Sequence, residues 1–238
     1  MIFRGDFRGD RADLPQGSAL AQRIYLLHPS RCVGLILLSV AYLAPSRTPF
    51  DLTAFNKLTN QAFGYPAYAY WDVFAADDGP AILRQNVETL FHAIHWDHPD
   101  AMRTFFATYG NTRRLLTTTG PETYPLKPYA QAPGFKEVFL ERMRRDGFEG
   151  PQCWYKAAAR NVNYAHEKGF PQERMRIEVP CLYIGATEDT VCRTDQMGRA
   201  RELVPDVTEF VVEANHWLTY EKPEEVGGLI AGWLRERY

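Results

Sequence analysis

Residues 179–189, Val-Pro-Cys-Leu-Tyr-Ile-Gly-Ala-Thr-Glu-Asp, hold a short apolar run that ends at Gly185 and is followed by polar residues. Such a run is typical of a strand that is buried on both faces of a parallel sheet. Outward from it, apolar runs at about 33–40 and 208–212 predict two further buried strands. A helical spacing of apolar residues at 18–28 precedes the first of these runs. Helix, loop and buried strand form half of a βαβ unit, so we predict an α/β fold with a parallel sheet.

The long segment 44–174 has no further run of the buried-strand type. Its apolar residues recur at helical spacing, between loops that contain Gly and Pro, at about 51–62, 79–95, 99–109, 134–146 and 151–167. We interpret 44–174 as a helical lid inserted into a core made of 17–43 and 175–238. Residues 1–16, which are rich in Arg, Asp and Gly, are predicted to be a divergent N-terminal tail.

Two helices are predicted in the last part of the chain, at about 194–203 and 223–237. Pro223 suits the first turn of the second helix, where its missing N–H leaves no bond unmade. Residues at helical spacing predict that this helix buries one stripe, formed by Val226, Leu229, Ile230 and Trp233.

The composition excludes several classes of protein. The 238 residues carry a formal net charge of −2, so neither nucleic acid nor an anionic membrane is an expected partner. The longest apolar run, from Cys32 to Ala44, is shorter than the roughly 20 residues that cross a bilayer. The N-terminus has no pattern of a signal peptide. The cysteines form no Cys-x-x-Cys pair and are expected to be free thiols in a cytoplasmic protein: Cys32, Cys153, Cys181 and Cys192.

An acid and a histidine follow the last two predicted strands. Asp189 comes four residues after Gly185, and His216 comes four residues after Val212. The loops beyond the carboxyl ends of parallel strands form the functional edge of an open sheet, so the two side chains are expected to meet. The acid would fix the tautomer of the imidazole, and the imidazole would activate water or a nucleophile. We therefore predict Asp189 and His216 as catalytic residues.

Five segments, taken in order, resemble the epoxide hydrolases of the α/β-hydrolase superfamily. Ala-Asn-His216-Trp, followed by a Lys-Pro step, resembles their catalytic-histidine segment, and Ile-Gly-Ala-Thr-Glu-Asp189 resembles their catalytic-acid loop. The other three resemble the helix after the nucleophile and two parts of the lid: 17–31, 63–71 and 154–156. The resemblance covers 17–238. It implies a partial α/β-hydrolase fold whose parallel sheet carries an inserted helical lid.

The resemblance also implies a chemistry and further site residues. In the family an aspartate attacks an epoxide carbon, two lid tyrosines stabilise the ring oxygen as it gains negative charge, and water activated by the histidine hydrolyses the ester. By this likeness the tyrosines are Tyr65 and Tyr155, with Tyr68 and Tyr70 as alternatives for the first role. The expected substrate is a small apolar epoxide, hydrolysed to a vicinal diol. No metal or organic cofactor is expected.

The nucleophile position departs from the family. The family aspartate lies in a Gly-His-Asp-Trp-Gly-Gly turn, and aligning that turn on Gly17-Ser18 places Pro15 at the nucleophile. A proline has no carboxylate, and its fixed φ does not suit a strained elbow. Asp13 is two positions away, and Ser18 lacks flanking glycines. We therefore expect that this chain alone does not hydrolyse epoxides.

The stretch before the helix is also shorter than in the family, where several strands precede the nucleophile. Sixteen residues precede Gly17 here. A truncated or wrongly assembled coding sequence is the preferred explanation. A catalytically dead homologue that acts in ligand binding or assembly is the other.

Two further possibilities carry less weight. A haloalkane dehalogenase would share the acid and the histidine, but it usually relies on nitrogen donors for the halide rather than on a tyrosine pair. His92, His95 and His98 have a spacing that a metal site could use, yet no clear acid or cysteine completes it, so they are interpreted as part of a half-exposed helix. The oligomeric state is left open.

Overall fold

The computed structural model describes residues 2–3 and 14–238. These residues form two compact units. The first contains the described residues up to Arg47 together with Glu167–Tyr238, and the second is Thr48–His166.

A sheet in the order β1-β2-β3-β4 lies at the centre of the first unit. The strands β2 (Cys32–Leu38), β3 (Cys181–Ala186) and β4 (Val207–Val212) run parallel, which confirms the predicted parallel sheet. The two-residue strand β1 (Ile2–Phe3) pairs antiparallel with β2. Sequence analysis did not predict β1, because it placed these residues in the divergent tail.

The burial of the strands follows their places in the sheet. All six residues of the inner strand β3 are buried, as expected for a strand with both faces covered. Strand β4 was also predicted to be buried, and this is wrong for most of its length. It is the last strand in the order, and Phe210 and Val211 are exposed. An apolar run alone does not distinguish an inner strand from an edge strand.

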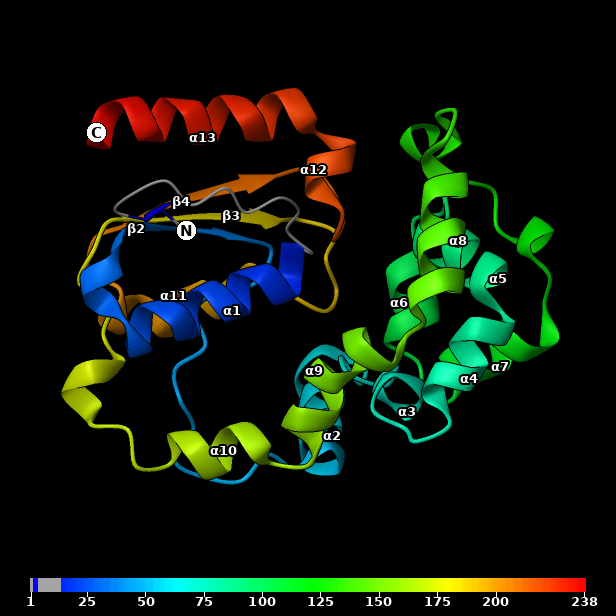
Figure 1. The fold of residues 1–238 in the computed structure, drawn as a ribbon, viewed down its shortest axis with the longest axis horizontal. Helices are drawn as coiled ribbons and strands as arrows, with labels where there is room; N and C mark the ends of the chain where they lie inside the picture. Colours follow the sequence, from blue (N-terminus) through cyan, green and yellow to red (C-terminus); the bar gives the residue numbers. More distant parts are fainter. Residues whose placement is uncertain (1, 4–13) are drawn as a thin grey trace. The chain divides into compact units, whose positions relative to one another are not determined.

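Helices cover the two faces of this sheet (Figure 1). Helix α13 (Pro223–Arg237) lies on one face, and α1 (Leu14–Leu27) and α11 (Asp195–Ala200) lie on the other. Alternate residues of β3 point to the two sides, because side chains along a strand alternate. The core beneath α1 and α11 includes Tyr25, Leu35, Leu37, Tyr183, Met197 and Val204. The core beneath α13 includes Leu182, Ile184, Val212, Leu218, Val226 and Trp233.

The helices of the first unit agree with the predictions except at their ends. Helix α1 begins at Leu14, four residues before the apolar spacing that predicted it. The predicted helix at 194–203 is α11 followed by a short 3-10 helix, Arg201–Leu203. A further turn of helix, α12 (Leu218–Glu221), precedes α13. Of the predicted stripe of α13, Val226 and Trp233 are buried, and Leu229 and Ile230 are partly buried.

The second unit is helical, as predicted for most of the inserted segment. Its helices are α2 (Leu52–Phe63), α3 (Trp71–Phe74), α4 (Gly79–Gln85), α5 (Val87–Ile94), α6 (Ala101–Phe106), α7 (Asn111–Thr118), α8 (Phe135–Asp146) and α9 (Glu149–Ala159). Helix α10 (Val162–Glu167) ends one residue beyond it. Two long predicted helices are each divided in two, at Asn86 and at 160–161. Helices α3 and α7 were not predicted.

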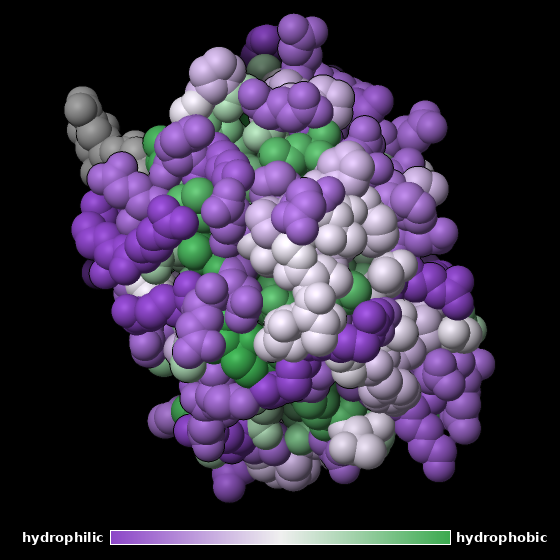
Figure 2. Space-filling model, turned by 90° about the vertical axis from the view of Figure 1, so that its right-hand side faces the viewer, coloured by the Kyte–Doolittle hydropathy of each residue, from purple (hydrophilic) through white to green (hydrophobic). Residues whose placement is uncertain are grey.

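The second unit has an aromatic core of its own. Its fully buried large side chains include Leu83, Phe91, Phe105, Leu116 and Tyr124. The face of the molecule in Figure 2 is largely hydrophilic, with apolar groups scattered over it, as is usual for a protein surface. Among the described helices, none is both long and apolar enough to cross a membrane.

Candidate functional site

The ends of the parallel strands bring Asp189 and His216 together. Strand β3 ends at Ala186 and β4 ends at Val212, and because the strands are paired in parallel their carboxyl ends meet at one edge of the sheet. Two backbone hydrogen bonds continue the pairing into the loops, from Thr187 N to the Val212 oxygen and from Glu188 N to the Ala214 oxygen. The loops that carry the acid and the histidine are thus held side by side.

The two predicted side chains form a short hydrogen bond. His216 Nδ1 lies 2.5 Å from Asp189 Oδ2. The other carboxylate oxygen, Oδ1, accepts hydrogen bonds from the backbone N–H groups of Val191 (2.9 Å) and Cys192 (2.8 Å). Asp189 is 3% exposed, so these bonds satisfy a buried charge. On the histidine side, Asn215 Oδ1 accepts from the Trp217 N–H at 3.0 Å and tightens the turn that presents the imidazole.

The hydrogen bond shifts both pKa values in the direction that favours an ion pair. Burial works to raise the pKa of the Asp189 carboxyl, but His216 and the two backbone N–H groups outweigh it and hold the pKa below its usual value. Burial works to lower the pKa of His216, but the charge and hydrogen bond of Asp189 outweigh it and raise the pKa. Such a pair holds the ring with Nδ1 on the acid, which leaves Nε2 as the nitrogen that can take a proton from water.

Ser39 is a neighbour of the pair that sequence analysis missed. It follows β2 directly, is fully buried, and has a φ of 61°, which is uncommon for a residue with a Cβ. Its Oγ donates to the backbone oxygen of His216 at 3.3 Å, and its backbone oxygen accepts from the Tyr183 hydroxyl at 3.3 Å. Ser39, which lies at the end of β2, therefore supports the loop that carries His216. No feature of the sequence distinguishes this serine from others in loops.

Cys192 is the second residue that was missed. Its sulfur lies within 4.8 Å of a carboxylate oxygen of Asp189 and of a ring nitrogen of His216. Burial, followed by the negative charge of Asp189, raises the pKa of this thiol well above its ordinary value. The group is therefore a neutral thiol at neutral pH and a poor nucleophile. The Asp-x-x-Cys spacing was a signal available in the sequence, but the four cysteines were judged only for disulfides and for Cys-x-x-Cys pairs.

The predicted tyrosines both lie in the second unit, in different surroundings. Tyr65 is buried, packs near Phe63 with ring centroids 6.1 Å apart, and lies under the Arg103 guanidinium at 5.4 Å. Tyr155, on α9, contacts the alternative candidate Tyr70 edge to face, with ring centroids 5.8 Å apart. Its ring also packs edge to face against Trp71 at 5.4 Å and Phe74 at 5.2 Å. The other alternative, Tyr68, stacks on Trp71 at 5.0 Å.

The backbone at the aligned nucleophile position is helical. Pro15 is the second residue of α1, a position that proline tolerates because the first helical N–H groups have no partner inside the helix. Asp13, the nearest carboxylate in sequence, lies outside the described residues. Ser18 Oγ is engaged with the backbone of Leu38, donating to its oxygen at 3.0 Å and accepting from its N–H at 2.9 Å. Ser18 thus anchors α1 to the end of β2.

The histidines at 92, 95 and 98 bind separate partners. His92 Nδ1 lies 3.1 Å from the backbone oxygen of Tyr124, and His95 Nδ1 lies 3.0 Å from the Tyr129 hydroxyl. His98 Nδ1 accepts from the backbone N–H of Asp100 at 3.1 Å. His92 lies in α5, but His95 is buried at the C-cap of that helix and His98 lies in the loop after it, so the predicted half-exposed helix is wrong for His95 and His98.

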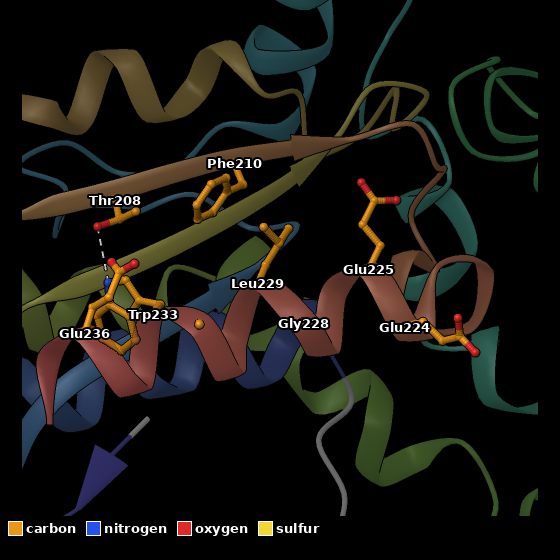
Figure 3. Close-up of a pocket in the computed structure, with 9 residues that line it drawn as sticks. Thr208, Phe210, Glu224, Glu225, Gly228, Leu229, Trp233 and Glu236 are labelled. Carbon is orange, nitrogen blue, oxygen red and sulfur yellow. Dashed lines mark hydrogen bonds between the residues drawn. The ribbon is translucent and has the colours of Figure 1, made fainter.

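A groove of about 410 Å³ lies between β4 and α13 (Figure 3). Phe210, Leu229 and Trp233 form its apolar part, and the Trp233 indole N–H donates to Thr208 Oγ1 at 3.2 Å. Glu224, Glu225 and Glu236 give it an acidic rim, and the other lining residues are Gly228 and Gly232. The lining does not include Asp189, Cys192 or His216, so the groove is a separate feature of the exposed β4 edge.

Several known proteins that this chain resembles in sequence are epoxide hydrolases. Bifunctional epoxide hydrolase 2 of Mus musculus is 30% identical over 100 residues, which are 42% of this chain and 17% of that protein. Bifunctional epoxide hydrolase 2 of Sus scrofa is 22% identical over 223 residues, 92% of this chain and 37% of that protein. Epoxide hydrolase B of Mycobacterium tuberculosis is 23% identical over 257 aligned positions, 92% of this chain and 69% of that protein. No family model matches the chain.

Several solved structures that this chain resembles are also epoxide hydrolases, and they show its fold. Epoxide hydrolase A from Mycobacterium thermoresistibile superposes with a TM-score of 0.70 at 22% identity, covering 92% of this chain and 67% of that one. Epoxide hydrolase I of potato (Solanum tuberosum) superposes with a TM-score of 0.69 at 18% identity, covering 93% and 67%. The chain therefore has an α/β-hydrolase fold, and it is similar in sequence and in structure to epoxide hydrolases.

Proposed function

We propose that this chain carries the acid–histidine pair and the lid tyrosines of an epoxide-hydrolase-type site that takes a small apolar epoxide. The observation that supports this most is the hydrogen bond of 2.5 Å between Asp189 and His216 at the ends of adjacent parallel strands. The named relatives, which are epoxide hydrolases, supply the substrate class.

His216 has the role of a general base in this proposal. With Nδ1 bound to Asp189, its Nε2 takes a proton from water, and the water oxygen then attacks an electrophilic carbon. The imidazolium that results is stabilised by the Asp189 carboxylate, whose own charge is held by the Val191 and Cys192 N–H groups. Asp189 is thus a positioning and stabilising group.

The tyrosines Tyr65 and Tyr155 have the role of acids in this proposal, with Tyr70 as the alternative for Tyr65. A phenol O–H donated to the epoxide oxygen stabilises the negative charge that develops as the ring opens. The family resemblance of their segments supports the assignment. The edge-to-face contact of Tyr155 with Tyr70 is a reason to test Tyr70 beside Tyr65.

Pro15 occupies the aligned position of the nucleophile and cannot carry out the first step of epoxide hydrolysis. The family reaction begins with a carboxylate attack that forms an ester, and a proline at the aligned position provides no such group. We therefore propose that this chain binds an epoxide without forming the ester. The helical backbone at Pro15 also supports the second candidate function, a ligand-binding or assembly homologue without turnover.

We also propose a cytoplasmic location, because all four cysteines are free thiols and none of them forms a Cys-x-x-Cys pair.

The test measures turnover and binding together. The purified chain is incubated with styrene oxide, the diol is quantified by chromatography, and binding is followed by calorimetry. We expect binding and no diol above the rate in buffer, with binding weakened by Tyr155→Phe, and by Tyr65→Phe or Tyr70→Phe. Diol release that is lost in Asp189→Ala or His216→Ala would overturn the proposed lack of turnover. No binding by the folded wild-type chain would overturn the proposed site.

A further inference from the structure

The side chains around the acid–histidine pair include a sulfur that the proposed reaction does not use. Asp189, Cys192 and His216 each offer one metal-ligating atom, and the three atoms all lie within 4.8 Å of one another. Asp189 and Cys192 come from the loop after β3, three residues apart, and His216 comes from the loop after β4. Asp189 and Cys192 are buried, whereas 14% of the His216 side chain is exposed and gives access from solvent.

The three donors suit one class of metal ion. A carboxylate oxygen, an imidazole nitrogen and a thiolate sulfur are the ligands of Zn²⁺ in proteins, where three protein ligands leave a fourth position for water. Ligand atoms in a tetrahedral zinc site lie roughly 3.5 Å apart, given bonds of about 2.0–2.3 Å. His216 Nδ1 and Asp189 Oδ2, now 2.5 Å apart, therefore have to separate by about 1 Å, and rotation of the Cys192 side chain about one bond can bring its sulfur, which lies within 4.8 Å of the other ligand atoms, to the same centre.

The charges also balance. A carboxylate and a thiolate together carry two negative charges, and a divalent cation between them makes the buried group neutral. Coordination releases the thiol proton to solvent, and the proton that His216 Nδ1 shares with Asp189 moves to Nε2 or to solvent, with no change in oxidation state. The second carboxylate oxygen of Asp189 stays bound to the N–H groups of Val191 and Cys192, which orients the ligand oxygen from behind.

We propose that Asp189, Cys192 and His216 form a binding site for a thiophilic divalent cation such as Zn²⁺ or Cd²⁺. The cation takes the electron pairs that the Asp189–His216 hydrogen bond now uses. The metal-bound state and the hydrogen-bonded pair therefore exclude each other, and bound metal removes His216 as a base. Metal binding itself requires no epoxide and no turnover, so it stands or falls separately from the proposed function.

The experiment uses the full chain, freed of metal and kept reduced, and titrates it with Cd²⁺. Cadmium–thiolate bonds absorb in the ultraviolet, so the absorption reports a bond to sulfur. We expect one equivalent of Cd²⁺ to produce this absorption and Zn²⁺ to displace it. Cys192→Ser should abolish the absorption, and His216→Gln and Asp189→Asn should each weaken binding more than about tenfold. Cys153→Ser, which removes the exposed cysteine, is the matched control and should change nothing.

A second measurement on the wild-type chain removes any dependence on the folding of a variant. Saturating Zn²⁺ should slow the alkylation of Cys192, followed by mass spectrometry of its peptide, and leave that of Cys153 unchanged. Absorption that persists in folded Cys192→Ser, full affinity in both His216→Gln and Asp189→Asn, no absorption in the wild type, or unprotected Cys192 would each overturn the proposal.

Discussion

Two histidines with little exposure have pKa values that shift in opposite directions. His216 faces the Asp189 carboxylate, and the pair raises its pKa. His95 is 4% exposed, and its ring packs against Phe91 with centroids 4.7 Å apart. Burial, followed by the positive charge of His92, lowers its pKa to about 3. The difference lies in whether a carboxylate is near enough to repay the loss of water around the charged ring.

His95 is therefore expected to make the stability of the protein depend on pH. The unfolded chain protonates this ring below about pH 6.5, whereas the folded chain keeps it neutral down to about pH 3. Because the unfolded state then binds the extra proton, the free energy of unfolding falls by up to about 1.4 kcal/mol for each pH unit below 6.5. Above pH 6.5 the ring is neutral in both the folded and the unfolded state, so this loss of stability is absent.

The measurement is urea unfolding at a series of pH values from 7 down to 5, well above the range in which carboxylates protonate. His95→Gln, which cannot be protonated, should show a flatter dependence than the wild type over the same range. His98→Gln, at an exposed histidine, is the control. Equal slopes in wild type and His95→Gln would contradict the assignment.

At the scale of elements, the division of one predicted helix into α9 and α10 has a specific cause. Asn161 adopts a left-handed backbone with φ 60° at the break. Its side-chain oxygen accepts from the backbone N–H of Phe50 at 2.6 Å, and its side-chain nitrogen donates to the Phe50 oxygen at 2.9 Å. An asparagine tolerates this backbone better than most residues and here also ties two distant segments of the second unit together.

Substitution of Asn161 should separate the contribution of its left-handed backbone from that of its two hydrogen bonds to Phe50. Asn161→Gly keeps the backbone freedom and loses both hydrogen bonds, at a cost of about 1–2 kcal/mol in the free energy of unfolding. Asn161→Ala loses the same bonds and adds the strain of a left-handed alanine, roughly a further 1 kcal/mol. Chemical denaturation of both variants measures the difference. An alanine variant as stable as the glycine variant would show that the break relaxes into continuous helix.

The elements that the sequence predicted well are those with a local pattern. The strand at 181–186 is a continuous apolar run because both of its faces are covered, and such a run is visible without knowledge of any partner. The break at Asn161 depends on hydrogen bonds to Phe50, which is distant in the sequence. The edge position of β4 depends on the strand order. Neither is a local property of the sequence.

The same distinction holds for the candidate site. Asp189 and His216 were predictable as neighbours because each follows a strand and parallel strands end at one edge. Ser39 was missed because its importance arises from a contact that only the fold creates, whereas the Asp-x-x-Cys spacing of Cys192 was visible in the sequence but its distance from His216 was not. The lid tyrosines were predicted by resemblance to a family, and their roles stay a prediction.

At the scale of the whole molecule, the chain has two separate sets of buried residues. In the first unit Leu182, on β3, is fully buried beneath α13. In the second unit Leu116, on α7, is fully buried as well. Each unit is compact by itself, and the chain leaves the first at Arg47 and returns to it at Glu167. Two compact units with their own cores are expected to open separately, as multi-domain chains often do.

This expectation can be tested with one truncation in each core. Leu182→Ala and Leu116→Ala remove the same atoms from fully buried sites and should each lower the stability of their own unit by about 2–5 kcal/mol. Amide hydrogen exchange, read by mass spectrometry of peptides, should then be faster throughout the unit that carries the substitution and unchanged in the other. Leu58→Ala, at an exposed leucine of the second unit, is the control and should leave both units as they are. Faster exchange in both units after either core substitution would mean that the chain unfolds as one cooperative body, because a weakened core would then lower the opening free energy of every amide that exchanges through global unfolding.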